Sequence, residues 1–150
     1  MGNIFNEDFK DFLVALNKYK AEYIIIGGYA VILHGYSRTT GDLDVWVNKT
    51  EDNYKKLVAA FSAFKMPLMG MTKENFLSNS NMDVFTYGRP PVCIDIMTSV
   101  KGMTFDESFP KSTLRKVEGI EVRLIDYRDL LNAKRASGRH KDLDDIENIK

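Results

Sequence analysis

Residues 26–45 constrain the fold more than any other part of this sequence. They read IGGYAVILHGYSRTTGDLDV, so a glycine pair follows an apolar segment and two aspartates flank a leucine further on. Because side chains alternate across a strand, Asp42 and Asp44 project from the same face and Leu43 from the buried one. At an effective dielectric near 20, two unit charges about 5 Å apart repel by roughly 3 kcal/mol. A cleft holding both carboxylates therefore favours a bound cation.

A third aspartate repeats this pattern later in the chain. The segments 82–87 and 91–98 are predicted to form a hairpin, and the second contains Ile94-Asp95-Ile96. Alternation places the two isoleucines on one face and Asp95 on the other. The sequence thus predicts that Asp42, Asp44 and Asp95 converge in one solvent-accessible cleft.

Apolar spacing and capping residues predict the other elements. Strands are expected at 23–26, 42–48 and 120–124. Helices are expected at 7–20, at 29–34 and at 141–150, and two more are expected to begin after Thr50 and after Asp126, the second ending at Gly138. Residues 73–77 are expected to form a helical turn. Gly27 and Gly28 are expected to form the turn between the first strand and its helix, and residues 99–113 to form a loop. The fold class is α+β (mixed α/β), with a small mixed sheet flanked by helices. We expect a single domain over 1–150, with a core at about 22–125 and a C-terminal helical segment at 126–150.

Composition narrows the class of protein further. The 150 residues carry 21 basic and 21 acidic side chains, so net charge gives no argument for nucleic-acid binding, although a local basic cleft is compatible with it. The single cysteine, Cys93, excludes an internal disulfide and fits a reducing compartment. No apolar run approaches the roughly 18 residues of a membrane span, and no signal segment is evident at the N-terminus. We therefore expect a cytoplasmic protein that does not interact with membranes.

Taken together, Gly27-Gly28, Asp42-Leu43-Asp44 and Ile94-Asp95-Ile96 resemble the signature of the DNA polymerase beta-like nucleotidyltransferase superfamily. With Lys134-Arg135 near the C-terminus, the chain resembles the small prokaryotic nucleotidyltransferases that include abortive-infection toxins. The resemblance covers about residues 22–145. It implies a nucleotidyltransferase-like fold and transfer of a nucleoside monophosphate from an NTP such as ATP to an acceptor hydroxyl.

The resemblance also implies a role for each motif residue. Asp42, Asp44 and Asp95 would be catalytic and hold magnesium, with two Mg²⁺ ions expected, because such ions clamp both reacting oxygens of a phosphoryl group. Gly27 and Gly28 would let backbone N–H groups approach the phosphates. These residues would bind substrate together with two cationic side chains, Arg38 and Lys134.

The acceptor and the partners stay open at this point. The acceptor could be tRNA, a protein side chain or a small molecule, and a homodimer or a partner protein could supply the surface that binds it. An alternative is a non-catalytic nucleotide-binding or antitoxin-like partner of a toxin–antitoxin pair that has kept the fold. A second alternative is a nucleic-acid-binding domain that uses the basic C-terminal cluster.

Four other features have competing interpretations. Arg38 could pair with a surface acid instead of a phosphate. His34 is more typical of a packing or helix-end residue than of a ligand. Trp46, on the aspartate face, could stack on a base but more often such a residue covers the core. Cys93 has no obvious catalytic partner, so inert burial is the favoured interpretation.

Overall fold

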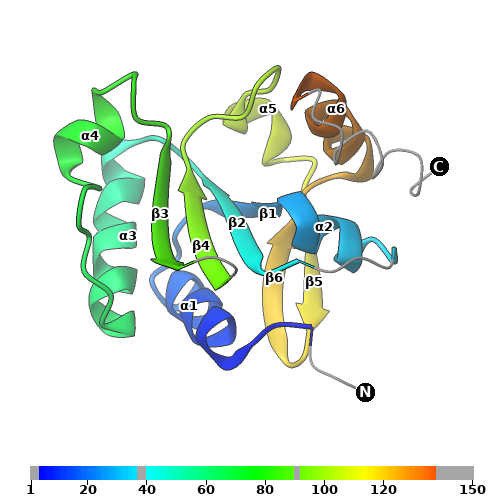
Figure 1. The fold of residues 1–150 in the computed structure, drawn as a ribbon, viewed down its shortest axis with the longest axis horizontal. Coiled ribbons are helices and arrows are strands. Elements are labelled where there is room, and N and C mark those ends of the chain that lie inside the picture. The colour runs from blue at the N-terminus through cyan, green and yellow to red at the C-terminus, as the bar shows by residue number, and fades with distance from the viewer. Residues whose placement is uncertain (1–3, 37–39, 90–91, 138–150) are drawn as a thin grey trace.

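A six-stranded mixed sheet organises the molecule. The structure is a computed structural model that describes residues 4–36, 40–89 and 92–137. Its strands are β1 (Tyr23–Ile26), β2 (Asp42–Val47), β3 (Val84–Arg89), β4 (Val92–Met97), β5 (Thr113–Val117) and β6 (Ile120–Leu124). They lie in the order β3-β4-β2-β1-β6-β5 (Figure 1). β2 is parallel to β4 and antiparallel to β1, and β1 is parallel to β6. The predicted α+β class, with a mixed sheet flanked by helices, is confirmed.

Helices flank this sheet and begin at capping residues that the sequence contains. They are α1 (Glu7–Lys18), α2 (Gly27–Leu33), α3 (Glu51–Phe64), α4 (Lys73–Leu77), α5 (Phe105–Ser108) and α6 (Tyr127–Ser137). The Asn6 carboxamide accepts a hydrogen bond from Phe9 N at 2.8 Å, and the Thr50 hydroxyl accepts one from Asn53 N at 3.1 Å. Each cap satisfies one of the backbone donors that a helix start leaves open. The predicted starts of α1 and α3 are confirmed.

The two faces of the sheet have different covers. On the face that carries Leu43 and Ile94, α1 and α3 pack together, with the Phe12 and Phe61 rings 5.7 Å apart and Phe61 in turn 5.1 Å from Tyr87. On the opposite face, which carries the aspartates, helices α5 and α6 lie over one end (Figure 1). The apolar core is therefore concentrated under α1 and α3. This leaves room for polar groups on the other face.

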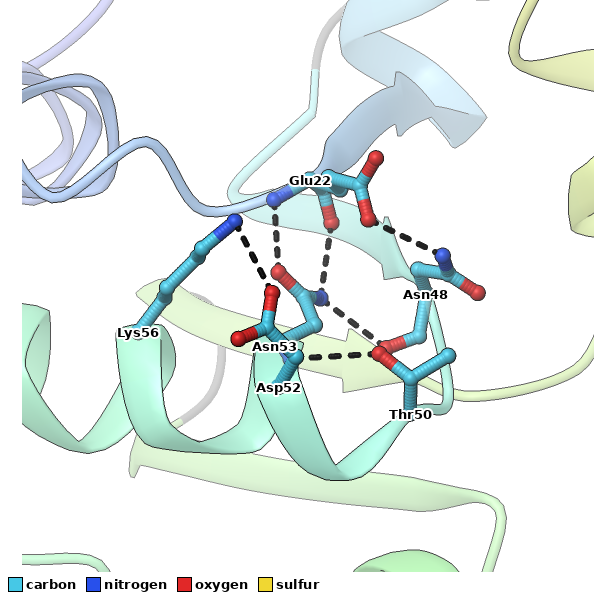
Figure 2. A network of polar contacts seen from close by, with 6 residues as sticks. All are labelled: Glu22, Asn48, Thr50, Asp52, Asn53 and Lys56. Atoms are coloured by element: carbon cyan, nitrogen blue, oxygen red, sulfur yellow. Dashed lines mark hydrogen bonds and ion pairs between the residues drawn. The ribbon is translucent and has the colours of Figure 1, made fainter.

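A buried asparagine ties the start of β1 to the end of β2. Asn53 has no exposed surface, and its side chain accepts from Glu22 N at 2.7 Å and donates to the carbonyls of Glu22 and Asn48 (Figure 2). Glu22 also accepts from the Asn48 carboxamide at 3.0 Å. Because buried polar groups are costly when unpaired, this network fixes the position of α3 against both strands.

Two of the predictions made from the sequence were wrong. Gly27 and Gly28 are not a turn before a helix but the first two residues of α2, which β1 enters directly. Residues 99–113 are not only loop, since they contain α5 and the first residue of β5. β5 pairs with β6 as an antiparallel hairpin, and only its last residue, Val117, is buried. An edge strand with one buried side chain lacks the alternation on which the prediction relied.

Some predictions lie outside the described residues. These are Arg38, the end of the last observed helix at Gly138 and the helix expected at 141–150. In the part of the chain that is described, no helix is both long enough and apolar enough to cross a membrane.

Candidate active site

Asp44 and Asp95 are direct neighbours across two parallel strands. The register of β2 and β4 pairs Asp44 with Asp95 and Asp42 with Cys93. Because paired residues on adjacent strands project from the same face, all three aspartates share one side of the sheet, as predicted. Asp42 lies two residues from Asp44 along the strand, about 7 Å at the usual rise. The structure therefore brings two carboxylates into contact and leaves the third one pleat away.

Burial and like charge strongly affect the Asp44 carboxyl. Burial is the largest cause that raises its pKa, to about 7, followed by the charge of Asp95 and a hydrogen bond with it, and then by the charge of Asp42. Lys134 acts in the opposite direction. A carboxyl group with a pKa near neutrality, beside a second carboxylate, is typical of a site built for a cation or a proton.

Gly27 lies directly against the Asp44 carboxylate. It has a φ of +70°, and a Cβ atom built on it would overlap Asp44 Oδ2 and lie 2.9 Å from Cγ. Both the backbone conformation and the close approach require glycine at this position. The first glycine of the pair therefore lets the start of α2 meet the carboxylate.

Gly28 lies against Thr40 and not against Asp44. A Cβ atom on Gly28 would come within 2.8 Å of the Thr40 hydroxyl oxygen and 2.9 Å of Thr40 Cβ. The second glycine thus lets the residues before β2 pack closely on α2. Both glycines therefore allow α2 to lie close to β2 and the residues before it, Gly27 through Asp44 and Gly28 through Thr40.

Asp95 has a partner on the neighbouring edge strand. Thr86 is paired with Asp95 in the antiparallel β3–β4 ladder, and its hydroxyl donates to Asp95 Oδ1 at 2.7 Å. A hydrogen bond to a ligand-forming carboxylate fixes its orientation. Thr86, Asp95 and Asp44 therefore form one row across three strands.

A cavity of about 280 Å³ opens beside this row. Its lining residues are Ile26, Gly27, Asp44, Val84, Met97, Ser99, Val100, Lys101, Leu130, Ala133 and Lys134. Helix α6 packs across one side and contributes Lys134, which is only 5% exposed. Two of the predicted site residues, Gly27 and Lys134, thus meet Asp44 in one cavity. The walls are mostly apolar, so the charges of Asp44 and of the buried Lys134 act there with less screening than in water, whereas Lys101 is exposed.

The donor chemistry at Asp44 and Asp95 fits magnesium. Mg²⁺ takes oxygen ligands and is usually held by one or two carboxylates together with substrate phosphates. Within residues 4–36, 40–89 and 92–137, no group of three or more His, Cys, Asp or Glu side chains could hold a metal ion by itself. The pair could therefore hold Mg²⁺ with phosphate oxygens completing the coordination. The three-aspartate metal site stays a prediction.

Three other residues singled out in the sequence have structural roles. Trp46 is buried, with its ring 5.4 Å from that of Phe105, so it covers the core. His34 Nε2 lies 2.8 Å from the Ile125 carbonyl oxygen, which ties the end of α2 to the segment after β6. Burial, with the nearby charges of Asp42 and Asp95, raises the pKa of the Cys93 thiol, which keeps it protonated and unreactive at neutral pH.

Sequence reasoning missed two residues of this site. Lys101 follows β4 by four residues, and its position after the strand that carries Asp95 was the available signal. Thr86 lies in the predicted hairpin, but only the observed register shows that it faces Asp95. Thr86 depends on the register of the hairpin and Lys101 on the path of the chain after β4, and periodicity reveals neither.

The fold and the site define the class of protein. Residues 5–150 match the family model described as nucleotidyltransferase of unknown function (DUF6036), and the chain belongs to this family. It is therefore a nucleotidyltransferase, an enzyme that transfers a nucleoside monophosphate. No curated protein matches the sequence significantly.

Solved structures with the same fold include other nucleotidyltransferases. The Thermotoga maritima protein TM1012, described provisionally as a nucleotidyltransferase, is 10% identical with a TM-score of 0.58, over 93% of this chain and 88% of its own. The lincosamide antibiotic adenylyltransferase LnuA, with lincomycin bound, is 14% identical with a TM-score of 0.57, over 99% and 98%. An antigenic nucleotidyltransferase-like protein from Paracoccidioides brasiliensis is 16% identical with a TM-score of 0.53, over 95% and 74%. At these identities the likeness is one of fold.

Proposed function

We propose that this protein transfers a nucleoside monophosphate from a nucleoside triphosphate to an acceptor hydroxyl in a magnesium-dependent reaction at Asp44 and Asp95. The observation that carries the proposal is the contact between these two carboxylates on adjacent strands, beside a cavity that also holds two lysines. A structural role alone does not account for two neighbouring, partly buried acids, since their repulsion destabilises the fold.

In this proposal Asp44 and Asp95 hold Mg²⁺, and Asp42 joins them as the third ligand. Bound magnesium, with two ions expected, would neutralise charge on the phosphates and lower the pKa of the acceptor hydroxyl. Thr86 keeps the Asp95 carboxylate oriented through its hydrogen bond. Asp95 would take the proton of the acceptor hydroxyl as that oxygen attacks the α phosphorus and pyrophosphate leaves, which is the role that the family resemblance implies for the third aspartate.

The triphosphate would occupy the cavity beside Asp44. Lys134 on α6 and Lys101 after β4 both line that cavity and supply positive charge. Gly27 lines the same cavity at the start of α2, where its backbone N–H would bind a phosphate oxygen. Arg38 and Gly28 complete the predicted substrate-binding set, the first as a guanidinium that pairs with a phosphate.

ATP is the nucleotide we propose first. LnuA, which shares this fold over nearly its whole length, is named as an adenylyltransferase that acts on lincosamide antibiotics. A small-molecule hydroxyl is the corresponding acceptor, and tRNA and a protein side chain remain the other candidates. A second copy of the chain or a partner protein would extend the acceptor surface, and the cytoplasm is the expected location.

Incubation with labelled nucleotides tests the proposal. The purified protein is mixed with one α-labelled NTP at a time, Mg²⁺ and total cell extract, and the label is followed into RNA, protein and small molecules. We expect Mg²⁺-dependent labelling of one fraction, which is lost with chelator and with Asp95→Asn. Binding of a nucleotide without transfer to any fraction would favour a non-catalytic member of the family.

A further inference from the structure

The hydroxyl group of Thr86 lies within hydrogen-bond distance of the carboxylate that is proposed to act as the general base. It donates to Asp95 Oδ1 at 2.7 Å. A general base has to lie about 2.6–3.2 Å from the oxygen whose proton it takes. The chain therefore places one of its own hydroxyl groups at the distance from Asp95 that an acceptor hydroxyl needs.

The Thr86 side chain is open to solvent at the edge of the sheet. In the part of the chain that the structure describes, β3 is the last strand on its side, and Thr86 is exposed (Figure 1). On the same face of β3 its neighbours are Val84, which is 43% exposed, and Gly88, which has no side chain. A substrate can therefore approach the Thr86 oxygen from solvent.

The cavity proposed to hold the triphosphate lies beside the same row of residues. The strand register places Asp44, Asp95 and Thr86 side by side on β2, β4 and β3. The cavity wall includes Asp44 and also Val84, which precedes Thr86 by two residues and projects from the same face of β3. An α-phosphate held by magnesium at Asp44 and Asp95 would therefore lie close to the Thr86 oxygen.

Other hydroxyl groups near the site have different contacts. Ser99 also lines the cavity, but its hydroxyl donates to Asp83 Oδ2 at 3.2 Å. Thr40 lies against Gly28, at the start of α2. Of these three hydroxyl groups, the one on Thr86 donates to an aspartate of the proposed metal site.

We propose that Thr86 is a site of self-modification, at which the protein transfers a nucleoside monophosphate to its own side chain when no external acceptor is bound. This inference rests on the proposed function. The Thr86 oxygen attacks the α phosphorus of the NTP, Asp95 takes the hydroxyl proton, and the bond to the bridging oxygen breaks so that pyrophosphate leaves. The product is a phosphodiester between Thr86 and the nucleoside. Because its ester oxygen carries no proton, the modified residue can no longer donate to Asp95.

Peptide mapping by tandem mass spectrometry tests the proposal. Purified wild type is incubated with Mg²⁺ and one NTP at a time, without an acceptor. We expect one nucleoside monophosphate on Thr86, and none with chelator or in Asp44→Asn. Thr86→Ser should retain the adduct at residue 86, and Thr86→Val should lose it completely. Thr113→Val, at an exposed position on the opposite edge strand β5, should be modified at Thr86 like the wild type.

The same variants distinguish an acceptor from a residue that only orients Asp95. A purely orienting role predicts slower transfer in Thr86→Val but no adduct on Thr86 in the wild type. The absence of that adduct with all four NTPs would therefore overturn the proposal. If the wild type still labelled a fraction of the cell extract, the proposed function would stand without self-modification. If neither Thr86 nor any fraction were labelled, the proposed function would fail as well.

A mixing experiment shows whether the reaction takes place within one chain. Wild type is incubated with NTP and Mg²⁺ in the presence of ¹⁵N-labelled Asp44→Asn protein, whose peptides are recognised by their mass. We expect the adduct on wild-type chains alone, because Thr86 donates to Asp95 of its own sheet. Equal modification of the Asp44→Asn chains would contradict self-modification.

Discussion

Gly27 and Asp44 are in such close contact that a Cβ atom on the glycine would overlap the aspartate carboxylate. The contact joins the first residue of α2 to the central acid of β2. Gly27 also has a φ of +70°, which L-residues adopt at a cost. The position of the Asp44 carboxylate thus depends on the absence of a side chain at residue 27.

Gly27→Ala should abolish transfer and destabilise the fold by more than backbone strain alone. Gly119→Ala is the matched control, because Gly119 has a φ of +85° and an added Cβ would meet no atom within 4 Å. Left-handed strain costs about 1–2 kcal/mol in each variant. Only Gly27→Ala also displaces Asp44. Urea unfolding and a transfer assay would measure both effects, and equal behaviour of the two variants would contradict the contact.

Asp44→Asn should make the metal-free protein more stable at alkaline pH. The folded-state pKa of Asp44, about 7, lies above its ordinary value of 3.8. The folded state therefore holds a proton that the unfolded state releases, and stability falls as the pH rises from about 4 to 7. Above pH 7 the free energy of unfolding has fallen by its full amount, on the order of a few kcal/mol.

Unfolding with urea in the presence of chelator checks this expectation across the pH range. Wild type and Asp44→Asn should be similar near pH 4 and diverge toward pH 8, with the variant more stable. Asp11→Asn, at an exposed position on α1, should follow the wild-type profile. A variant less stable than wild type at pH 8 would show that the ionised Asp44 carboxylate does not destabilise the metal-free fold.

Thr86→Val should lower kcat by roughly tenfold while the fold is kept, since partners that orient a metal ligand have effects of this size. Thr86 is exposed and valine is favoured in strands, so little stability is lost. Thr86→Ser keeps the hydroxyl that donates to Asp95 and should restore the rate. Steady-state kinetics with the identified acceptor would distinguish the variants, and equal rates for valine and serine would exclude a positioning role.

Asn53→Ala should destabilise the protein by about 3 kcal/mol, because three buried hydrogen bonds are lost at about 1 kcal/mol each. Asn48→Ala removes one side-chain bond, to Glu22, and should cost about 1 kcal/mol. Chemical denaturation of the two variants measures both losses. Similar losses of unfolding free energy in the two variants would show that the three hydrogen bonds of Asn53 do not contribute separately.

The central part of the fold was predictable because its signals are local. β1 is buried along its whole length and was predicted at its observed bounds, and alternation assigned Asp44 and Asp95 to the correct strand faces. Short or edge elements were not recognised. α5 has only four residues, although Thr104 caps its start by accepting a hydrogen bond from Glu107 N and donating one to the Glu107 carboxylate.

The site was predictable only in part. The aspartates and glycines were singled out from their order in the sequence, and Lys134 from a family resemblance. Thr86 and Lys101 were missed, because their proximity to the aspartates depends on strand pairing and on the path of the chain after β4. The pKa of Asp44 likewise follows from burial and from Asp95, neither of which is encoded locally.

Calorimetric titration of ATP with Mg²⁺ into wild type, Asp44→Asn and Asp95→Asn tests the central claim most directly, because it needs no knowledge of the acceptor. We expect saturable, Mg²⁺-dependent binding to wild type, with GTP, CTP and UTP as comparisons. Each variant should bind at least about tenfold more weakly, since it loses a carboxylate that holds the metal. Nucleotide binding of equal strength in all three proteins would contradict the assignment of Asp44 and Asp95 as the metal-binding pair.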